Sequence, residues 1–155
     1  MCATSERAQV MARFAALVAG LWAGVLACIG LIAAPAAFAA LATRADAGRV
    51  VARVFAQEAY LSIALALLLF VIERRHSRLA AEAGTGSVLS TNLVLLLGTL
   101  FCTVAGHFAL QPMMEAARAG RGAWSFGALH AVSLALFVLK GLLVLALAWR
   151  FTGPR

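Results

Sequence analysis

The sequence is poor in charged residues, and in acidic residues above all. Of its 155 residues, six are Asp or Glu and 13 are Lys or Arg, so charged residues make up 12% of the chain. Hydrophobic residues make up 64%. A soluble globular domain carries about 25% charged and about 45–50% apolar residues. The composition therefore excludes an ordinary soluble domain and indicates a chain that lies largely in lipid.

Cysteine is scarce too, and the short motifs of soluble enzymes are missing. The three cysteines are Cys2, Cys28 and Cys102, and two of them lie inside apolar runs. An odd number placed in this way does not fit the disulfide framework of a small secreted protein. The sequence also lacks a glycine-rich phosphate loop and a G-x-S-x-G motif. No enzymatic activity is predicted.

The positive charge has a simpler explanation than nucleic acid. A net charge of +7 would fit a nucleic-acid-binding protein. Here, however, the arginines lie in short spacers between apolar runs, where membrane topology accounts for them. The predicted partner is the lipid bilayer, and no nucleic acid is expected.

Four apolar runs are each close to the length of about 20 residues that a membrane-spanning helix needs. The first has an apolar core too long for a signal peptide, so it is expected to stay in the protein. The polar spacers at residues 42–53 and 73–87 are predicted loops, and Pro112 is predicted to end the third helix. Short connections favour antiparallel neighbours. The predicted fold is an all-α integral membrane four-helix bundle with up-down topology, in one domain over residues 1–155, with helices at approximately 14–38, 54–73, 88–110 and 126–149.

The distribution of arginine predicts the orientation. Seven arginines lie on the side of the two termini and five on the other side. Positive residues are enriched in cytoplasmic loops, so both termini are predicted to be cytoplasmic. The seven are Arg7, Arg13, Arg74, Arg75, Arg78, Arg150 and Arg155, and the five are Arg44, Arg49, Arg53, Arg118 and Arg121.

Small residues on the first helix predict a packing face. Gly20 and Gly24 form a G-x-x-x-G pattern, and Cys28 continues the same face. Such patterns let two membrane helices approach closely. The face can receive another helix of this chain or a second copy in a homo-oligomer.

Three ionisable residues share one depth when positions are counted from the predicted helix ends. Glu58, His107 and His130 each lie roughly 5–6 Å inside the side opposite the termini, and Met114 lies at the rim. Three interpretations stay open. The groups can hydrogen-bond one another and hold the helices together. They can bind or pass a small solute, ion or proton. Finally, His107, His130 and Met114 can ligate a metal, or the histidines haem, although no spacing matches a strong metal motif and no cofactor is predicted.

Lys140 is the most unusual residue of the fourth helix. It shares one polar stripe with His130 and Ser133 and lies near the bilayer centre, where a lone charge costs at least about 2.5–3.5 kcal/mol. The predicted helix ends place no acidic residue at its depth. Lys140 is therefore expected to be neutral, or to reach water or polar groups such as Asn92 and Thr99. Either a small wet cavity or a role in ion or proton passage would explain it.

One moderately specific motif and several short pieces occur together along the chain. The motif is F-x-x-L-H-x-x-S, with Phe126, Leu129, His130 and Ser133. The shorter pieces are Leu21-Trp22-Ala23-Gly24, Ala34-Pro35, Phe38, Ala47-Gly48, Phe55, Tyr60, Pro112 and Met114. Together they resemble a family of small integral membrane proteins of unknown function in bacteria, related to eukaryotic transmembrane protein 205, which implies a place in the inner membrane of a bacterium.

The resemblance implies a four-helix membrane domain and marks His130 and Ser133 as site residues. It brings no established reaction. The eukaryotic relative is associated with resistance to platinum drugs, which implies transport or the handling of a soft metal. Lys140 does not belong to the matching pattern. Taken together, the sequence favours a protein that binds or passes a small solute or ion. The alternatives are an accessory subunit of a membrane complex and, more weakly, a haem- or metal-binding redox protein.

Overall fold

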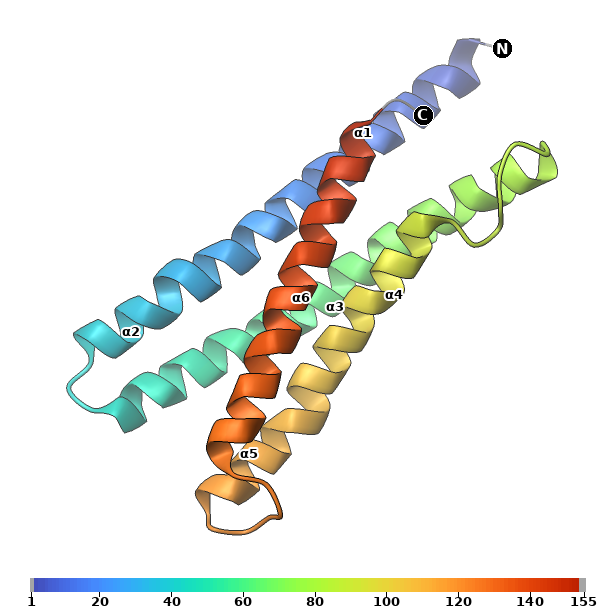
Figure 1. Cartoon of the computed structure of the whole chain (residues 1–155). Coiled ribbons are helices and arrows are strands. Elements are labelled where there is room, and N and C mark those ends of the chain that lie inside the picture. Colours follow the sequence, from blue (N-terminus) through green and yellow to red (C-terminus); the bar gives the residue numbers. More distant parts are fainter. Residues whose placement is uncertain (1, 154–155) are drawn as a thin grey trace.

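The computed structural model describes the backbone of residues 2–153 and the side chains of residues 9–153. Arg155 and the side chain of Arg7, both used in the orientation count, lie outside these described residues. Within them every regular element is helical, and four helical rods form a bundle (Figure 1). Each rod is long and apolar enough to cross a membrane. The predicted fold class, an all-α membrane helix bundle, is confirmed.

Two of the four rods are continuous helices and two contain a π-helical segment. In chain order, the rods are α1 (Cys2–Cys28) with η1 (Ile29–Ala33) and α2 (Ala34–Ala40); α3 (Arg44–Glu82); α4 (Thr91–Thr103) with η2 (Val104–Ala109) and α5 (Leu110–Arg118); and α6 (Phe126–Thr152).

The second rod is much longer than its apolar run. The spacers that the sequence predicts as loops are mostly helical, because α3 starts at Arg44 and continues to Glu82. Its first turn is capped by Thr43, whose hydroxyl accepts a hydrogen bond from the backbone N–H of Asp46 at 3.1 Å. Alanine, arginine and glutamate are good helix formers in water, so a helix need not stop where hydrophobicity stops.

Pro112 does not end the third helix, contrary to the sequence prediction. Proline cannot donate a hydrogen bond to the carbonyl four residues before it, and its ring clashes with that carbonyl. Those carbonyls belong to Phe108 before Pro112 and to Leu31 before Pro35, and both lie in the π-helical segments η2 and η1. The wider π-turn accommodates each proline, so both rods continue past it.

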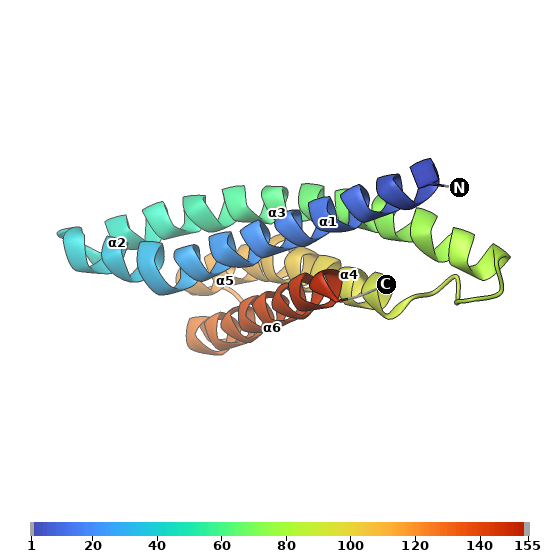
Figure 2. The same ribbon diagram turned by 90° about the horizontal axis from the view of Figure 1, so that it is seen from above.

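The rods follow an up-down course with antiparallel neighbours (Figure 1). The beginning of α1, the end of α6 and the α3–α4 connection lie at one end of the bundle, here called the terminal end. The other two connections lie at the opposite end, here called the loop end. Around the bundle, α1 packs against α6, α6 against α4, α4 against α3, and α3 against α1. Hence α3 and α6 form a diagonal pair, and they lie on opposite sides of the bundle in Figure 2.

The apolar core lies toward the terminal half. There α1, α3, α4 and α6 bury large side chains together, among them Trp22, Leu69, Leu96 and Leu147. Toward the loop end the rods separate into two pairs, with α2 against α3 and α5 against α6 (Figure 1). This separation opens space between the pairs, and the polar residues discussed above lie around it.

Candidate functional site

A buried ion pair joins the diagonal helices α3 and α6. The Nζ of Lys140 donates to both carboxylate oxygens of Glu58, at 2.8 Å and 2.7 Å. The two side chains are only 5% and 3% exposed. The prediction that no acidic residue lies at the depth of Lys140 is therefore wrong. Its cause is the length of α3: Glu58 lies fourteen residues after Arg44, just as Lys140 lies fourteen residues after Phe126, so both are about 21 Å into their helices.

Two further hydrogen bonds hold the carboxylate in place. The Ser62 hydroxyl donates to Oε1 of Glu58, and the indole Nε1–H of Trp22 donates to the Ser62 Oγ at 2.9 Å. The Nζ of Lys140 also lies 5.2 Å from the centroid of the Phe137 ring, within range of a cation–π interaction. Glu58 therefore accepts from Ser62 of α3 and Lys140 of α6, while Trp22 of α1 holds the Ser62 hydroxyl. Hydrogen bonds of this kind offset part of the free-energy cost of removing a buried ion pair from water.

A cavity of about 740 Å³ extends from this pair toward the loop end. Its size falls within the range of about 300–1,000 Å³ that is typical of small-molecule sites. Glu58 and Lys140 lie at its inner end, together with Cys102. Its outer lining includes Arg44 and Arg118, which stand at the first residue of α3 and the last residue of α5.

The cavity brings together the polar and metal-ligating candidates named from the sequence. Its lining includes Glu58, His107, Met114, His130, Ser133 and Lys140. The shared depth predicted for Glu58, His107 and His130 is wrong, because Glu58 lies fourteen residues into α3 whereas His130 lies four residues into α6. The two histidines make aromatic contacts within the chain. The His107 ring lies 4.9 Å from that of Phe108 in an edge arrangement, and the His130 ring stacks on Phe126 at 5.7 Å. Their place in the cavity lining follows from the geometry, whereas their role in binding remains a prediction.

The metal hypothesis gains no further ligand from the fold. Within the described part of the chain, no group of three or more His, Cys, Asp or Glu residues gathers in a way that could hold a metal ion. Met114 is buried, at 5% exposure, beside the same cavity as the two histidines. A metal or haem site built on His107, His130 and Met114 therefore stays a prediction.

Asn92 and Thr99 form hydrogen bonds with other groups and not with Lys140, contrary to the sequence prediction. The Thr99 hydroxyl donates to a backbone carbonyl of its own helix at 2.7 Å. Asn92 donates through Nδ2 to Oε1 of Glu73 at 3.1 Å and accepts from Nε of Arg150 at 2.6 Å. These contacts form a separate polar network between α3, α4 and α6 at the terminal end.

The lining of the cavity is mostly apolar, and its charged side chains are predominantly cationic. It includes the side chains of Arg44, Arg49, Arg118 and Lys140 but a single carboxylate, that of Glu58, which Lys140 neutralises. Arg49 has its own exposed partner, since it forms an ion pair with Asp46. Arg44 and Arg118, here called the rim arginines, are site residues that could not be predicted from the sequence. The predicted helices ended with the apolar runs, whereas α3 and α5 extend beyond them and carry these two arginines to the cavity.

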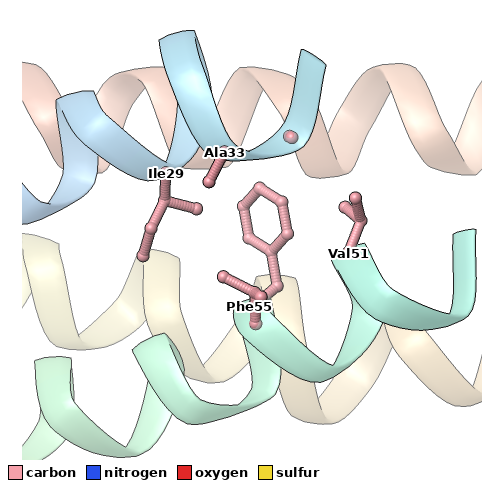
Figure 3. A pocket seen from close by; sticks show the side chains of 6 residues that line it. Ile29, Ala33, Val51 and Phe55 are labelled. Carbon is pink, nitrogen blue, oxygen red and sulfur yellow. The ribbon is translucent and has the colours of Figure 1, made fainter. Parts of the chain in front are cut away.

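An apolar seam closes the cavity toward the first rod. In Figure 3, Ile29 and Ala33 of η1 face Val51 and Phe55 of α3. The void between them is only about 10 Å³ and has no polar surface. A space of that size holds at most about one water molecule, and water needs polar partners. Val51 and Phe55 also line the large cavity, so this apolar contact forms one side of it and leaves no room for a water path toward η1.

The predicted packing face of α1 is not used inside the chain. Gly20 and Gly24 are exposed, and a Cβ at either position would meet no atom within 4 Å. The side of α1 that packs into the bundle instead carries Ala15, Ala19 and Trp22. A G-x-x-x-G face on α1 therefore remains a prediction for contact with another chain.

Comparisons with known proteins identify a family and add no activity. No curated protein and no solved structure matches the chain. The resemblance to relatives of transmembrane protein 205 finds no support in these comparisons. One family matches residues 17–123, a range that contains Glu58 and His107 but ends before α6 and its Lys140. That family is described as a domain of unknown function, DUF4149, and the chain belongs to it.

Proposed function

We propose that the protein binds a small solute or ion in the cavity between its two helix pairs, within the inner membrane of a bacterium. One observation carries the proposal: a cavity of about 740 Å³ ends at a buried ion pair and is lined by polar groups from α3, α4, η2, α5 and α6. Sites of this kind are mostly apolar, with a few converging polar groups that fix the ligand. Ionisable residues inside a membrane bundle commonly mark such a site.

Binding is favoured over open conduction by what lies beyond the ion pair. On the terminal side of Glu58 and Lys140 the bundle is filled by Leu69, Leu96 and Val144, each fully buried. A channel needs a continuous polar path through the membrane. Passage of a solute through this chain would therefore require a rearrangement of the core or a second copy.

Two native cysteines allow a direct test of access to the cavity. Cys102 lines the cavity and is 3% exposed, whereas Cys28 lies on the outer surface of α1, where lipid is expected. Water-soluble thiol reagents react with the thiolate, which forms in a hydrated site and not in lipid. In a Cys2→Ser background in sealed vesicles, a small anionic methanethiosulfonate added on the loop-end side should modify Cys102.

The matched control is Cys102→Ser, which leaves Cys28 and should be modified far more slowly. Solutes that slow the modification of Cys102 would be ligands of the cavity. Equal, slow modification of both cysteines, unaffected by any solute, would contradict the proposal.

We also propose a homo-oligomer built on the exposed face of Gly20 and Gly24, and a native residue can report it. Cys28 continues that face and is exposed. Mild oxidation of native membranes should therefore produce a Cys28–Cys28 linked dimer. Gly24→Leu should abolish the cross-link, because a large side chain prevents close helix approach. If a different protein is linked instead, the chain acts as a subunit of a larger complex.

A further inference from the structure

We infer that the cavity takes up a small organic anion together with one proton, with the anion at Lys140 and the proton at Glu58. This inference rests on the proposed function and names its ligand class. It follows from the charge balance of the inner end of the cavity, from the bonds that hold Glu58, and from the composition of the walls.

The charge balance couples the anion to a proton. As found, the ammonium of Lys140 and the carboxylate of Glu58 cancel one another in a site where both are at most 5% exposed. An anion that took Lys140 as its partner without a proton would leave the Glu58 carboxylate, only 3% exposed, without its cation, which is strongly unfavourable. An anion arriving with a proton keeps the site neutral.

The hydrogen bond from Ser62 allows Glu58 to lose its contact with Lys140 without becoming unpaired. The Ser62 hydroxyl, itself held by the Trp22 indole, donates to Oε1 of Glu58 independently of Lys140. A protonated Glu58 therefore keeps a partner when the ammonium moves away. Lys140 lines the cavity and carries its charge on a flexible four-carbon stem, so it can turn its donors toward a ligand.

The walls select for an anion with an apolar part. Arg44 and Arg118 at the outer end create a positive potential that attracts anions. The rings of Phe55 and Phe137 line the interior and offer apolar contact. A monovalent organic anion, such as an aromatic or short aliphatic carboxylate, matches both features.

The step conserves charge and atoms. A hydronium ion or buffer acid gives up one proton, which forms an O–H bond on the Glu58 carboxylate, and Lys140 stays an ammonium throughout. The ammonium exchanges the Glu58 carboxylate for the incoming anion as its partner. Release reverses both changes.

The other titratable groups that line the cavity with Glu58 are Lys140 and His130 of α6, Cys102 of α4 and His107 of η2, with the always-charged Arg44, Arg49 and Arg118 farther out. An ammonium and a thiol have no free site for a further proton, whereas an imidazole can accept one, so the two histidines define the controls. From α1, the group that reaches the network is the Trp22 indole, which does not titrate.

The test uses the full-length protein in detergent, with benzoate as the probe and uncharged benzamide as its isosteric control. Calorimetry in buffers of different ionisation enthalpy counts the protons taken up for each benzoate bound. We expect about one proton per benzoate, and an apparent affinity that falls about tenfold for each unit rise in pH. Benzamide should bind at least tenfold more weakly and take up no proton.

Three variants separate the roles of the two residues. Glu58→Gln imitates the protonated state, so it should bind benzoate with no proton uptake and no dependence on pH. Lys140→Met should lose benzoate binding. Because that variant leaves Glu58 buried and unpaired, the double variant Glu58→Gln with Lys140→Met serves as a folded check and should also fail to bind. His107→Gln and His130→Gln should each retain the uptake of one proton.

Several results would overturn the inference. They are benzoate binding to the wild type without proton uptake, loss of binding in Glu58→Gln, equal binding of benzamide, or no benzoate binding at all. If Cys102 is meanwhile protected by an uncharged solute, the cavity still binds a ligand and only the ligand class is wrong. Failure of both experiments would remove the proposed function as well.

Discussion

Glu58 and Lys140 bond to each other across the bundle although their helices, α3 and α6, are not neighbours. The pair stands where the four packed rods of the terminal half give way to two separated pairs. It therefore ties the two pairs together at the inner end of the cavity. A ligand that replaces one of these partners would loosen this tie, which would link binding to the separation of the helix pairs.

The first prediction concerns the stability that this ion pair confers. Lys140→Met leaves a buried carboxylate without its cation, so it should lower the free energy of unfolding by about 3–5 kcal/mol. Replacing both partners, Glu58→Leu with Lys140→Met, removes the unpaired charge and should restore most of the loss. Denaturant titration of the purified protein in mild detergent would measure both effects. A double variant no more stable than Lys140→Met would show that the unpaired carboxylate is not the cause of the loss.

The second prediction concerns the hydrogen bonds behind Glu58. Trp22→Phe removes the indole donor while keeping a buried aromatic ring, and Ser62→Ala removes the hydroxyl that links it to Glu58. Each change should destabilise the protein by about 1–2 kcal/mol. The double variant should cost less than the sum, because both residues act in one chain of bonds. Additive losses in the same unfolding assay would show that the two bonds are independent.

The four spanning helices could be predicted from composition alone. Runs of about 20 apolar residues have few stable alternatives in a membrane, because backbone groups there must be hydrogen-bonded internally. Glu58, His107 and His130 do line one cavity, but not at the single depth that counting from the predicted helix ends gave them. Such counting relies on the fixed rise of an α-helix, so it is only as good as the predicted helix ends.

The ends of the helices and the partner of Lys140 could not be predicted in the same way. Hydrophobicity marks the part of a helix that lies in lipid, whereas α3 continues through polar sequence from Arg44 to Glu82. Starting the count at residue 54 placed Glu58 ten residues too shallow, and this alone hid its pairing with Lys140. The end of the third helix was predicted wrongly at Pro112, because a π-helical segment before this proline lets the rod continue to Arg118.

The third prediction uses two glycines in the same rod. A Cβ at Gly30 would lie 3.0 Å from Cε1 of Phe137, whereas one at Gly24 would meet nothing within 4 Å. Gly30→Ala should therefore push Phe137 and cost about 1–3 kcal/mol. In the monomeric protein in detergent, where no second copy covers this face, Gly24→Ala should be neutral or stabilising by up to about 1 kcal/mol, because alanine favours a helix over glycine. Thermal unfolding of both variants provides the comparison, and equal midpoints would show that Phe137 moves without cost.

The effect of Gly30→Ala on the cavity can be measured through the reactivity of Cys102. Phe137 lines the cavity and lies close to Lys140. If Gly30→Ala displaces its ring, the rate at which thiol reagents modify Cys102 should change, while Gly24→Ala leaves that rate as in the wild type. An unchanged rate in both variants would place Phe137 outside the path that reagents follow.

The last prediction concerns the side of the membrane on which the cavity opens. If both termini are cytoplasmic, the loop end and the rim arginines face away from the cytoplasm, and ligands reach the cavity from there. The predicted bias rests on seven arginines against five, and three of the seven are Arg74, Arg75 and Arg78 near the end of α3. A C-terminal fluorescent protein should therefore be fluorescent, and a C-terminal alkaline phosphatase inactive. Replacing those three arginines with glutamine leaves four against five, so phosphatase activity should appear as part of the chains insert the other way. Active phosphatase on the unmodified chain would reverse the orientation and place the opening of the cavity toward the cytoplasm.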